Sequence, residues 1–199
     1  SIENSKNLEE LHLYYNNISE IPVEIFRINT LRKLYLFKNV IKKIPAEIYQ
    51  LTGLHTLELN KNNLISIPSE IKYLKNLKEL NISDNPLSKI PVEIGQLKQL
   101  RKLFLSGLCL TKIPDEIFQL NMLHLLHLEN NDLTEIPPEI NKLLHLCYLS
   151  LKGNKNLKIT DFTPFEHIQE VIVDREQIDA SSIPKNIIVY GKNQDGIPF

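Results

Sequence analysis

Hydrophobic residues recur along this chain at a period of 23 residues. Each unit reads Leu-x-x-Leu-x-Leu, then Ile-Pro, then Ile and Leu. Alternation of apolar and polar positions predicts a short strand with one buried face, and Ile-Pro predicts that the chain then turns back. We expect seven parallel strands, at residues 11–13, 34–36, 57–59, 80–82, 103–105, 126–128 and 149–151.

Two polar features complete the unit. An asparagine column follows the strands, at Asn16, Asn39, Asn62, Asn85, Asn131 and Asn154. Its amides can satisfy backbone groups that the loop leaves open. The proline is expected at the first position of a short helical turn, where no N–H is needed, and a glutamate two residues later lies near the positive end of that turn. Stacked units then give a parallel sheet on a concave face and helical turns on a convex face, with one cooperative core.

The unit L-x-x-L-x-L-x-x-N-x-L-x-x-I-P-x-E-I-x-x-L-x-x resembles the leucine-rich-repeat family over about residues 8–190. Its I-P-x-E-I variety is similar to repeats of eukaryotic Ras-associated scaffold proteins and of spirochaetes and related bacteria. The resemblance implies an α/β solenoid, a curved right-handed coil, whose function lies at variable positions. It implies protein recognition, in the cytoplasm for a eukaryotic scaffold, or secreted or on the cell surface for a bacterial protein.

The regularity of the pattern divides the chain into three segments. Residues 8–154 are regular repeats, whereas residues 1–7 hold one apolar residue, Ile2, which is too little to cover a coil. We expect the first coil to expose core and a sheet edge open to self-association, whether further repeats precede it or residues 1–7 are a thin cap. Residues 155–199 read as degenerate repeats and a C-terminal cap, with a last strand at 187–190.

The fifth unit departs from the asparagine column. It has Leu108 there, so its loop must satisfy backbone groups differently. This is either a tolerated local adjustment or a functional bulge. Cys109 and Cys147 lie two coils apart, about 10 Å at ordinary strand spacing, so both are expected to be free thiols.

Composition narrows the function further. Lys+Arg 23 against Asp+Glu 24 is a balance that disfavours nucleic acid. No apolar run approaches the roughly 18 residues needed to span a membrane. We expect neither an enzyme nor a cofactor, because the sequence has no phosphate loop and no activated nucleophile. His124, His127, His145 and Cys147 are zinc-ligand types, but their spacing fits no closed site, so no metal is expected.

Outward strand residues suggest where a partner binds, because they alternate with the buried leucines. They form two aromatic clusters separated by polar residues of the third and fourth units. The N-terminal aromatic cluster is His12, Tyr14, Tyr35 and Phe37, and the C-terminal aromatic cluster is Phe104, Leu125, His127 and Tyr148. Exposed aromatics mark interfaces, so we expect a protein partner of unknown identity on the concave face. The alternatives are rings that merely stack across coils, and a structural or adhesive surface protein without one compact epitope.

Overall fold

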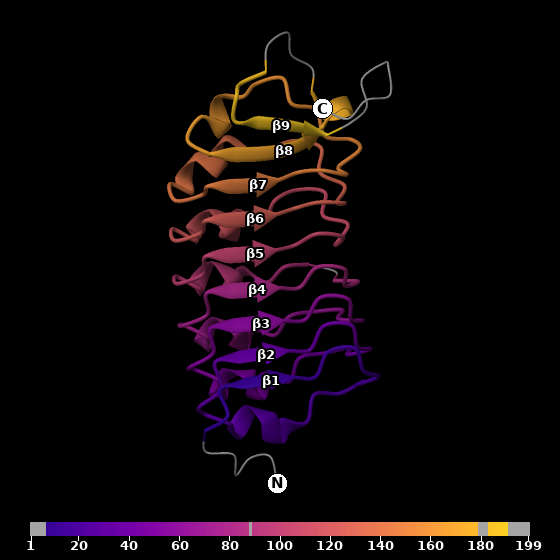
Figure 1. Cartoon of the computed structure of the whole chain (residues 1–199), viewed down its shortest axis with the longest axis vertical. Coiled ribbons are helices and arrows are strands. Elements are labelled where there is room, and N and C mark those ends of the chain that lie inside the picture. Colours follow the sequence, from indigo (N-terminus) through magenta and orange to yellow (C-terminus); the bar gives the residue numbers. More distant parts are fainter. Residues whose placement is uncertain (1–6, 88, 179–182, 191–199) are drawn as a thin grey trace.

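The computed structural model describes residues 7–87, 89–178 and 183–190. Within these residues, nine strands form one parallel sheet, stacked in chain order along the long axis (Figure 1). The regular strands are β1 (Glu10–His12), β2 (Lys33–Tyr35), β3 (Thr56–Glu58), β4 (Glu79–Asn81), β5 (Lys102–Phe104), β6 (Leu125–His127) and β7 (Tyr148–Ser150). Two more follow, β8 (Glu170–Asp174) and β9 (Ile187–Tyr190). The predicted α/β solenoid with a parallel sheet is confirmed.

The strands of the regular repeats begin and end one residue earlier than predicted. Residues 11–13 were expected in the first coil, but β1 is Glu10–His12. The third leucine still pairs, because the Leu13 N–H donates to the Tyr35 carbonyl at 2.9 Å. The backbone then enters the left-handed region at Tyr15, with φ 56°, and this turn ends the strand. The same conformation recurs every 23 residues, at Tyr15, Lys38, Lys61, Asp84, Gly107, Asn130 and Gly153.

Short 3-10 helices form the return segment of each coil. They are η2 (Val23–Arg27), η3 (Ala46–Gln50), η4 (Ser69–Tyr73), η5 (Val92–Gln96), η6 (Asp115–Gln119), η7 (Pro138–Lys142), η8 (Thr163–Phe165) and η9 (Arg175–Gln177). In η2 to η6, proline stands at the N-cap and not at the predicted first helical position. The reason is geometric: Pro22 is extended, with ψ 128°, and its carbonyl accepts the first turn's hydrogen bond from Ile25.

The core is continuous along the stack. Leu31, Leu34 and Leu36 of the second coil are 0% exposed, and each such burial contributes about 1.5–3 kcal/mol relative to an exposed side chain. In the first coil, Leu11 and Leu13 are only partly buried, as expected for a coil covered on one side. Residues 1–6 and 191–199, which belong to the proposed terminal segments, lie outside the described residues.

Asparagine side chains join neighbouring coils through buried hydrogen bonds. The Asn62 amide donates to the carbonyls of Leu36 and Leu59 at 2.9 and 3.0 Å, and its Oδ1 accepts the Ile41 N–H at 3.1 Å. Each such asparagine thus forms hydrogen bonds with backbone groups of its own loop and of the preceding coil. Gln177 takes over this role at the end of the ladder, donating to Leu151 and Asn154.

The ladder is interrupted at Leu108, and the structure shows how the loop compensates. The Leu87 N–H, which an asparagine at position 108 would have accepted, donates instead to the Asn85 carbonyl at 2.8 Å. Asn131 Oδ1 accepts both the Leu108 and the Leu110 N–H, at 3.1 and 3.0 Å. Leu108 itself is buried, 3% exposed. These contacts support the interpretation of a tolerated adjustment.

Two smaller observations complete the fold. Cys109 and Cys147 are both free, as predicted from their separation along the stack. None of the helices found in residues 7–87, 89–178 and 183–190 has the length and hydrophobicity to cross a membrane.

Candidate protein-binding surface

The sheet presents three side chains of each coil away from the core. In β2 and β3 the middle leucine is buried, whereas the first and third residues are only partly buried. The residue two positions after the strand shares this side, since Tyr14 contacts His12 in the same coil. We call the surface formed by these three positions the outer face of the sheet. It is the face that the sequence predicts to be concave.

The N-terminal aromatic cluster assembles as two stacked pairs. His12 and Tyr35 lie with ring centroids 4.6 Å apart and planes at 12°, and Tyr14 and Phe37 lie 4.6 Å apart at 9°. Tyr14 remains 41% exposed and His12 is exposed, while Tyr35 and Phe37 are partly buried. Rings therefore do stack across coils, yet the stacked pairs keep substantial aromatic surface in solvent.

Tyr15 extends this cluster and is missed by the sequence pattern. It is 63% exposed, and its ring meets Tyr14 and Phe37 edge-on at 5.9 and 5.7 Å. Lys38 Nζ lies 4.0 Å from the centre of the Tyr15 ring and also bonds its hydroxyl. Strict alternation would place residue 15 on the opposite side from Tyr14. The left-handed backbone at Tyr15 breaks that alternation, and two adjacent tyrosines are the only sequence signal.

An ion pair borders the N-terminal aromatic cluster. Lys33 Nζ lies 2.7 Å from Glu10 Oε1. Lys33 lowers the pKa of Glu10, and Glu10 raises the pKa of Lys33. His12 Nε2 is 3.6 Å from the other oxygen of Glu10. Burial raises the pKa of the Tyr35 hydroxyl, which keeps it a neutral hydrogen-bonding group. The cluster is thus apolar in its centre and charged along one side.

The C-terminal aromatic cluster is less exposed than the N-terminal one. His127 packs between Phe104 and Tyr148, with ring centroids 4.9 and 5.1 Å away, and Leu125 pairs in register with Tyr148. All four side chains are partly buried. Burial lowers the pKa of His127, although Glu129 Oε1, 3.5 Å from its Nδ1, opposes that shift. The structure therefore brings the four predicted residues together, but they expose less side-chain surface than the N-terminal aromatic cluster does.

Polar residues of the third and fourth coils separate the two clusters. Asn81 Nδ2 donates to Glu58 Oε2 at 2.9 Å, and Lys102 Nζ lies 3.3 Å from Glu79 Oε2. Asn60 Oδ1 is buried without a hydrogen-bond partner among the described residues. Acceptors outnumber donors in this central part of the outer face.

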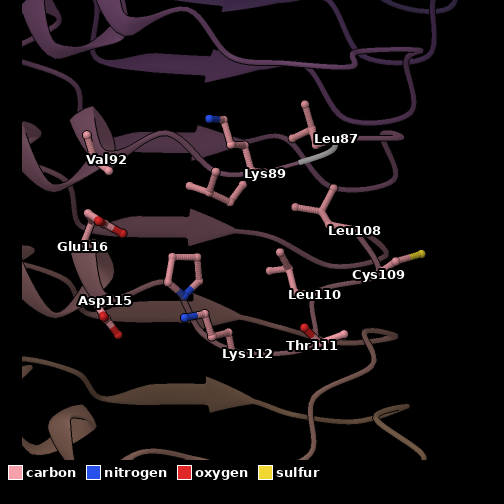
Figure 2. Close-up of a pocket in the computed structure, with 12 residues that line it drawn as sticks. Leu87, Lys89, Val92, Leu108, Cys109, Leu110, Thr111, Lys112, Asp115 and Glu116 are labelled. Atoms are coloured by element: carbon pink, nitrogen blue, oxygen red, sulfur yellow. The ribbon is translucent and has the colours of Figure 1, made fainter.

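One hollow lies elsewhere, beside the interrupted ladder. This hollow has a volume of about 440 Å³ and lies between the fourth and fifth coils, with Leu87, Lys89, Leu108 and Lys112 along its walls (Figure 2). Leu87 and Leu108 are 7% and 3% exposed, so these two side chains offer a ligand little apolar surface. Cys109 points away from its centre (Figure 2). We do not assign a site here.

His124 and His145, which lie outside the outer face, have local partners. His124 and His145 stack at 5.8 Å, and His124 Nδ1 lies 2.6 Å from the Met122 carbonyl. The Cys147 thiol donates to the His145 carbonyl. Over the described part of the chain, no group of three His, Cys, Asp or Glu side chains could hold a metal ion.

These features define a solenoid of stacked 23-residue coils with a sheet on one face and 3-10 turns on the other. A family profile described as a leucine-rich repeat region matches residues 1–107 and 88–183. The chain belongs to the leucine-rich-repeat family. Proteins of this family are generally protein-interaction modules, and the family and fold neighbours are repeat proteins of a non-enzymatic kind.

Solved structures of leucine-rich-repeat proteins are similar to this chain. A leucine-rich-repeat protein of Leptospira interrogans is 33% identical, with a TM-score of 0.79, over 93% of this chain and 46% of that protein. The functional domain of InlJ from Listeria monocytogenes, which includes a cysteine ladder, is 22% identical with a TM-score of 0.74, over 95% of this chain and 40% of its own.

A third similar structure is the internalin InlF of Listeria monocytogenes, 19% identical with a TM-score of 0.76, over 95% of this chain and 57% of its own. At such identities, the two Listeria proteins bear on the fold alone. This chain spans about half the length of these solved proteins. No curated protein sequence matches the chain.

Proposed function

We propose that this protein binds another protein on the outer face of its sheet, and that the N-terminal aromatic cluster with Tyr15 is the main contact. One observation carries the proposal. Five aromatic side chains from two adjacent coils lie side by side, and Tyr14 and Tyr15 remain 41% and 63% exposed. Buried leucines already supply the core, so the fold does not need these rings.

The energetics favour a protein partner. When a partner covers an aromatic ring that is exposed to water, the burial stabilises the complex by about 25 cal/mol per Å² of apolar surface. Tyrosine is enriched among the few residues that carry most of the energy of an interface. The Glu10–Lys33 ion pair and Lys38 supply a polar border that can orient the partner. The C-terminal aromatic cluster is the second candidate on the same face.

A structural or adhesive role without one compact epitope is the rival. No single cluster supports this role. It predicts that binding tolerates point substitutions but responds to salt or to shortening of the solenoid. We do not propose an enzyme. The outer-face carboxylates Glu10, Glu58 and Glu79 are held by ion pairs and hydrogen bonds.

A matched pair of double variants tests the proposal. Tyr35→Ala with Phe37→Ala removes the half-buried rings of the cluster, and neither side chain belongs to the leucine core. Tyr49→Ala with Tyr73→Ala is the control, because these exposed tyrosines also touch, edge-on at 6.2 Å, but lie on the helical turns. Both variants should keep the circular dichroism spectrum of the wild type.

The two variants should differ in binding. For a partner captured by pull-down and then purified, the Tyr35/Phe37 variant should lose at least about 2 kcal/mol of affinity, measured by calorimetry. The Tyr49/Tyr73 variant should bind normally. Equal binding by a well-folded Tyr35/Phe37 variant would contradict the proposed cluster and direct the same test to Phe104, His127 and Tyr148.

A further inference from the structure

Glu58 occupies the middle of the outer face. It is the last residue of β3, in register with Tyr35 on β2 and with Asn81 on β4. Its Oε2 accepts a hydrogen bond from Asn81 at 2.9 Å, and its side chain is partly buried. Oε1 has no hydrogen-bond partner among the described residues and is not completely buried. The carboxylate is therefore fixed by one oxygen and available through the other.

Glu58 differs from its neighbours in having no cation. Glu10 is paired with Lys33 at 2.7 Å and Glu79 with Lys102 at 3.3 Å, but the described residues place no cation within ion-pair distance of Glu58. Burial raises the pKa of Glu58, and the charge of Glu79 adds to this; the Asn81 hydrogen bond and Lys102 oppose it. Burial thus removes water from the Glu58 carboxylate, and the cation that opposes this shift, Lys102, is paired with Glu79, so the desolvation is a cost in the free protein.

The outer-face side chains around Glu58 also carry more acceptor oxygens than donor groups. The six outer-face side chains of the third and fourth coils include two carboxylates and no cation: Thr56, Glu58, Asn60, Glu79, Asn81 and Ser83. Asn60 Oδ1 is buried and accepts no hydrogen bond. The region is complementary to a positively charged, donor-rich group.

Aromatic rings border this region. His12 covers one face of the Tyr35 ring, so the other face is turned toward β3 and Glu58. A cation that approaches Glu58 therefore passes over or beside a tyrosine ring. A guanidinium group suits both surfaces, because it is planar, stacks on aromatic rings, is more weakly hydrated than an ammonium group and forms forked bonds with carboxylates.

We propose that Glu58 receives an arginine side chain of the protein partner, stacked against Tyr35 and bound through Glu58 Oε1. This inference rests on the proposed function and specifies its partner: a protein segment with an arginine flanked by apolar side chains that cover the N-terminal aromatic cluster. The bound guanidinium supplies the charge that Glu58 lacks. Its remaining N–H groups lie within reach of the acceptors around Asn60 and Asn81.

A displayed library of random 12-residue peptides, selected on the wild-type chain, tests this. The recovered peptides should be enriched in arginine next to aromatic or aliphatic residues. The tightest is then synthesised with its arginine and with citrulline, which keeps the shape of arginine without its charge. Replacing arginine by citrulline should weaken binding by about tenfold or more.

Two protein variants locate the contact. Glu58→Gln keeps an oxygen for Asn81 but removes the charge, and it should weaken the arginine peptide about as much as citrulline does. Glu47→Gln, an exposed glutamate on the turn η3, is the matched control and should leave affinity unchanged. Glu58→Gln should have little further effect on the affinity of the citrulline peptide, because the protein variant and the peptide change remove the same interaction.

The outcomes separate this inference from the proposed function. Peptides that lose binding with Tyr35→Ala and Phe37→Ala, but lack a cation and ignore Glu58→Gln, would overturn the arginine assignment and leave the outer face as the binding surface. Peptides that ignore every outer-face variant would overturn both. An arginine peptide that binds Glu58→Gln and the wild type equally would also refute a contact at Glu58.

Discussion

Asn62 shows what one side chain does for two coils. Its amide donates to two carbonyls, Leu36 and Leu59, and each of these also accepts from a neighbouring asparagine. The Ile41 N–H, in contrast, depends on Asn62 Oδ1 for its only described acceptor. Loss of the asparagine therefore leaves mainly one buried donor without a partner.

This argument predicts the cost of removing the amide. Asn62→Leu should lower the free energy of unfolding by about 1–3 kcal/mol, the penalty for an unsatisfied buried donor. Urea denaturation followed by circular dichroism measures it. An unchanged midpoint would mean that the Ile41 N–H finds another acceptor, as the Leu87 N–H does in the fourth coil.

The charge of Glu58 gives a second prediction at this scale. Because burial raises its pKa, the folded protein holds more protons than the unfolded chain just above pH 4.5, so Glu58 costs stability increasingly as the pH rises through its folded pKa. Glu58→Gln should therefore raise the melting temperature at pH 7, and by less at pH 4. A lower melting temperature at pH 7 would show that the charge is compensated in the free protein.

At the scale of the element, the fifth coil shows that a strong sequence rule can be locally replaced. An asparagine at position 108 would donate to the carbonyls of Ile82 and Leu105, which already accept from Asn85 and Asn131. It would also remove a buried leucine. Leu108→Asn is thus the control for Asn62→Leu and should raise the free energy of unfolding little or not at all. Strong stabilisation would contradict the adaptation of this loop.

The strands are short elements whose side chains obey alternation only while the backbone stays extended. Lys33, Leu34 and Tyr35 follow the rule, outward, inward and outward. Tyr15 does not, because it lies in the left-handed turn that ends each coil's strand. This difference explains why the outer-face positions within strands were predicted correctly and the fifth ring of the binding surface was not.

At the scale of the whole molecule, stability comes from each coil stacking on the next. Strands pair at an offset of 23 residues from β1 to β7, and the asparagine ladder follows the same offset. Contacts between coils are therefore nearly interchangeable along the regular part of the stack, as in other repeat proteins.

Interchangeable coils predict the outcome of removing one. Deletion of residues 62–84 joins Lys61 to Asn85 and preserves the repeat, so the shortened chain should unfold cooperatively, with a urea m-value lower by roughly a tenth. Deletion of residues 63–84 is the control: it shifts the pattern by one residue and should lose cooperative folding. If the 23-residue deletion unfolded like the control, equivalence of the coils would be refuted.

The sequence by itself determined the coil, because leucines at fixed spacing can be buried in only one way: the strand, the turn and the order of the sheet followed from their period. It also determined which residues face outward within strands. Only the tertiary structure decided the stacking of His12 on Tyr35, the contact of Tyr15 with Tyr14 and Phe37, and the absence among the described residues of a cation within ion-pair distance of Glu58. These depend on backbone twist, rotamers and distances between side chains of different coils, which periodicity does not specify.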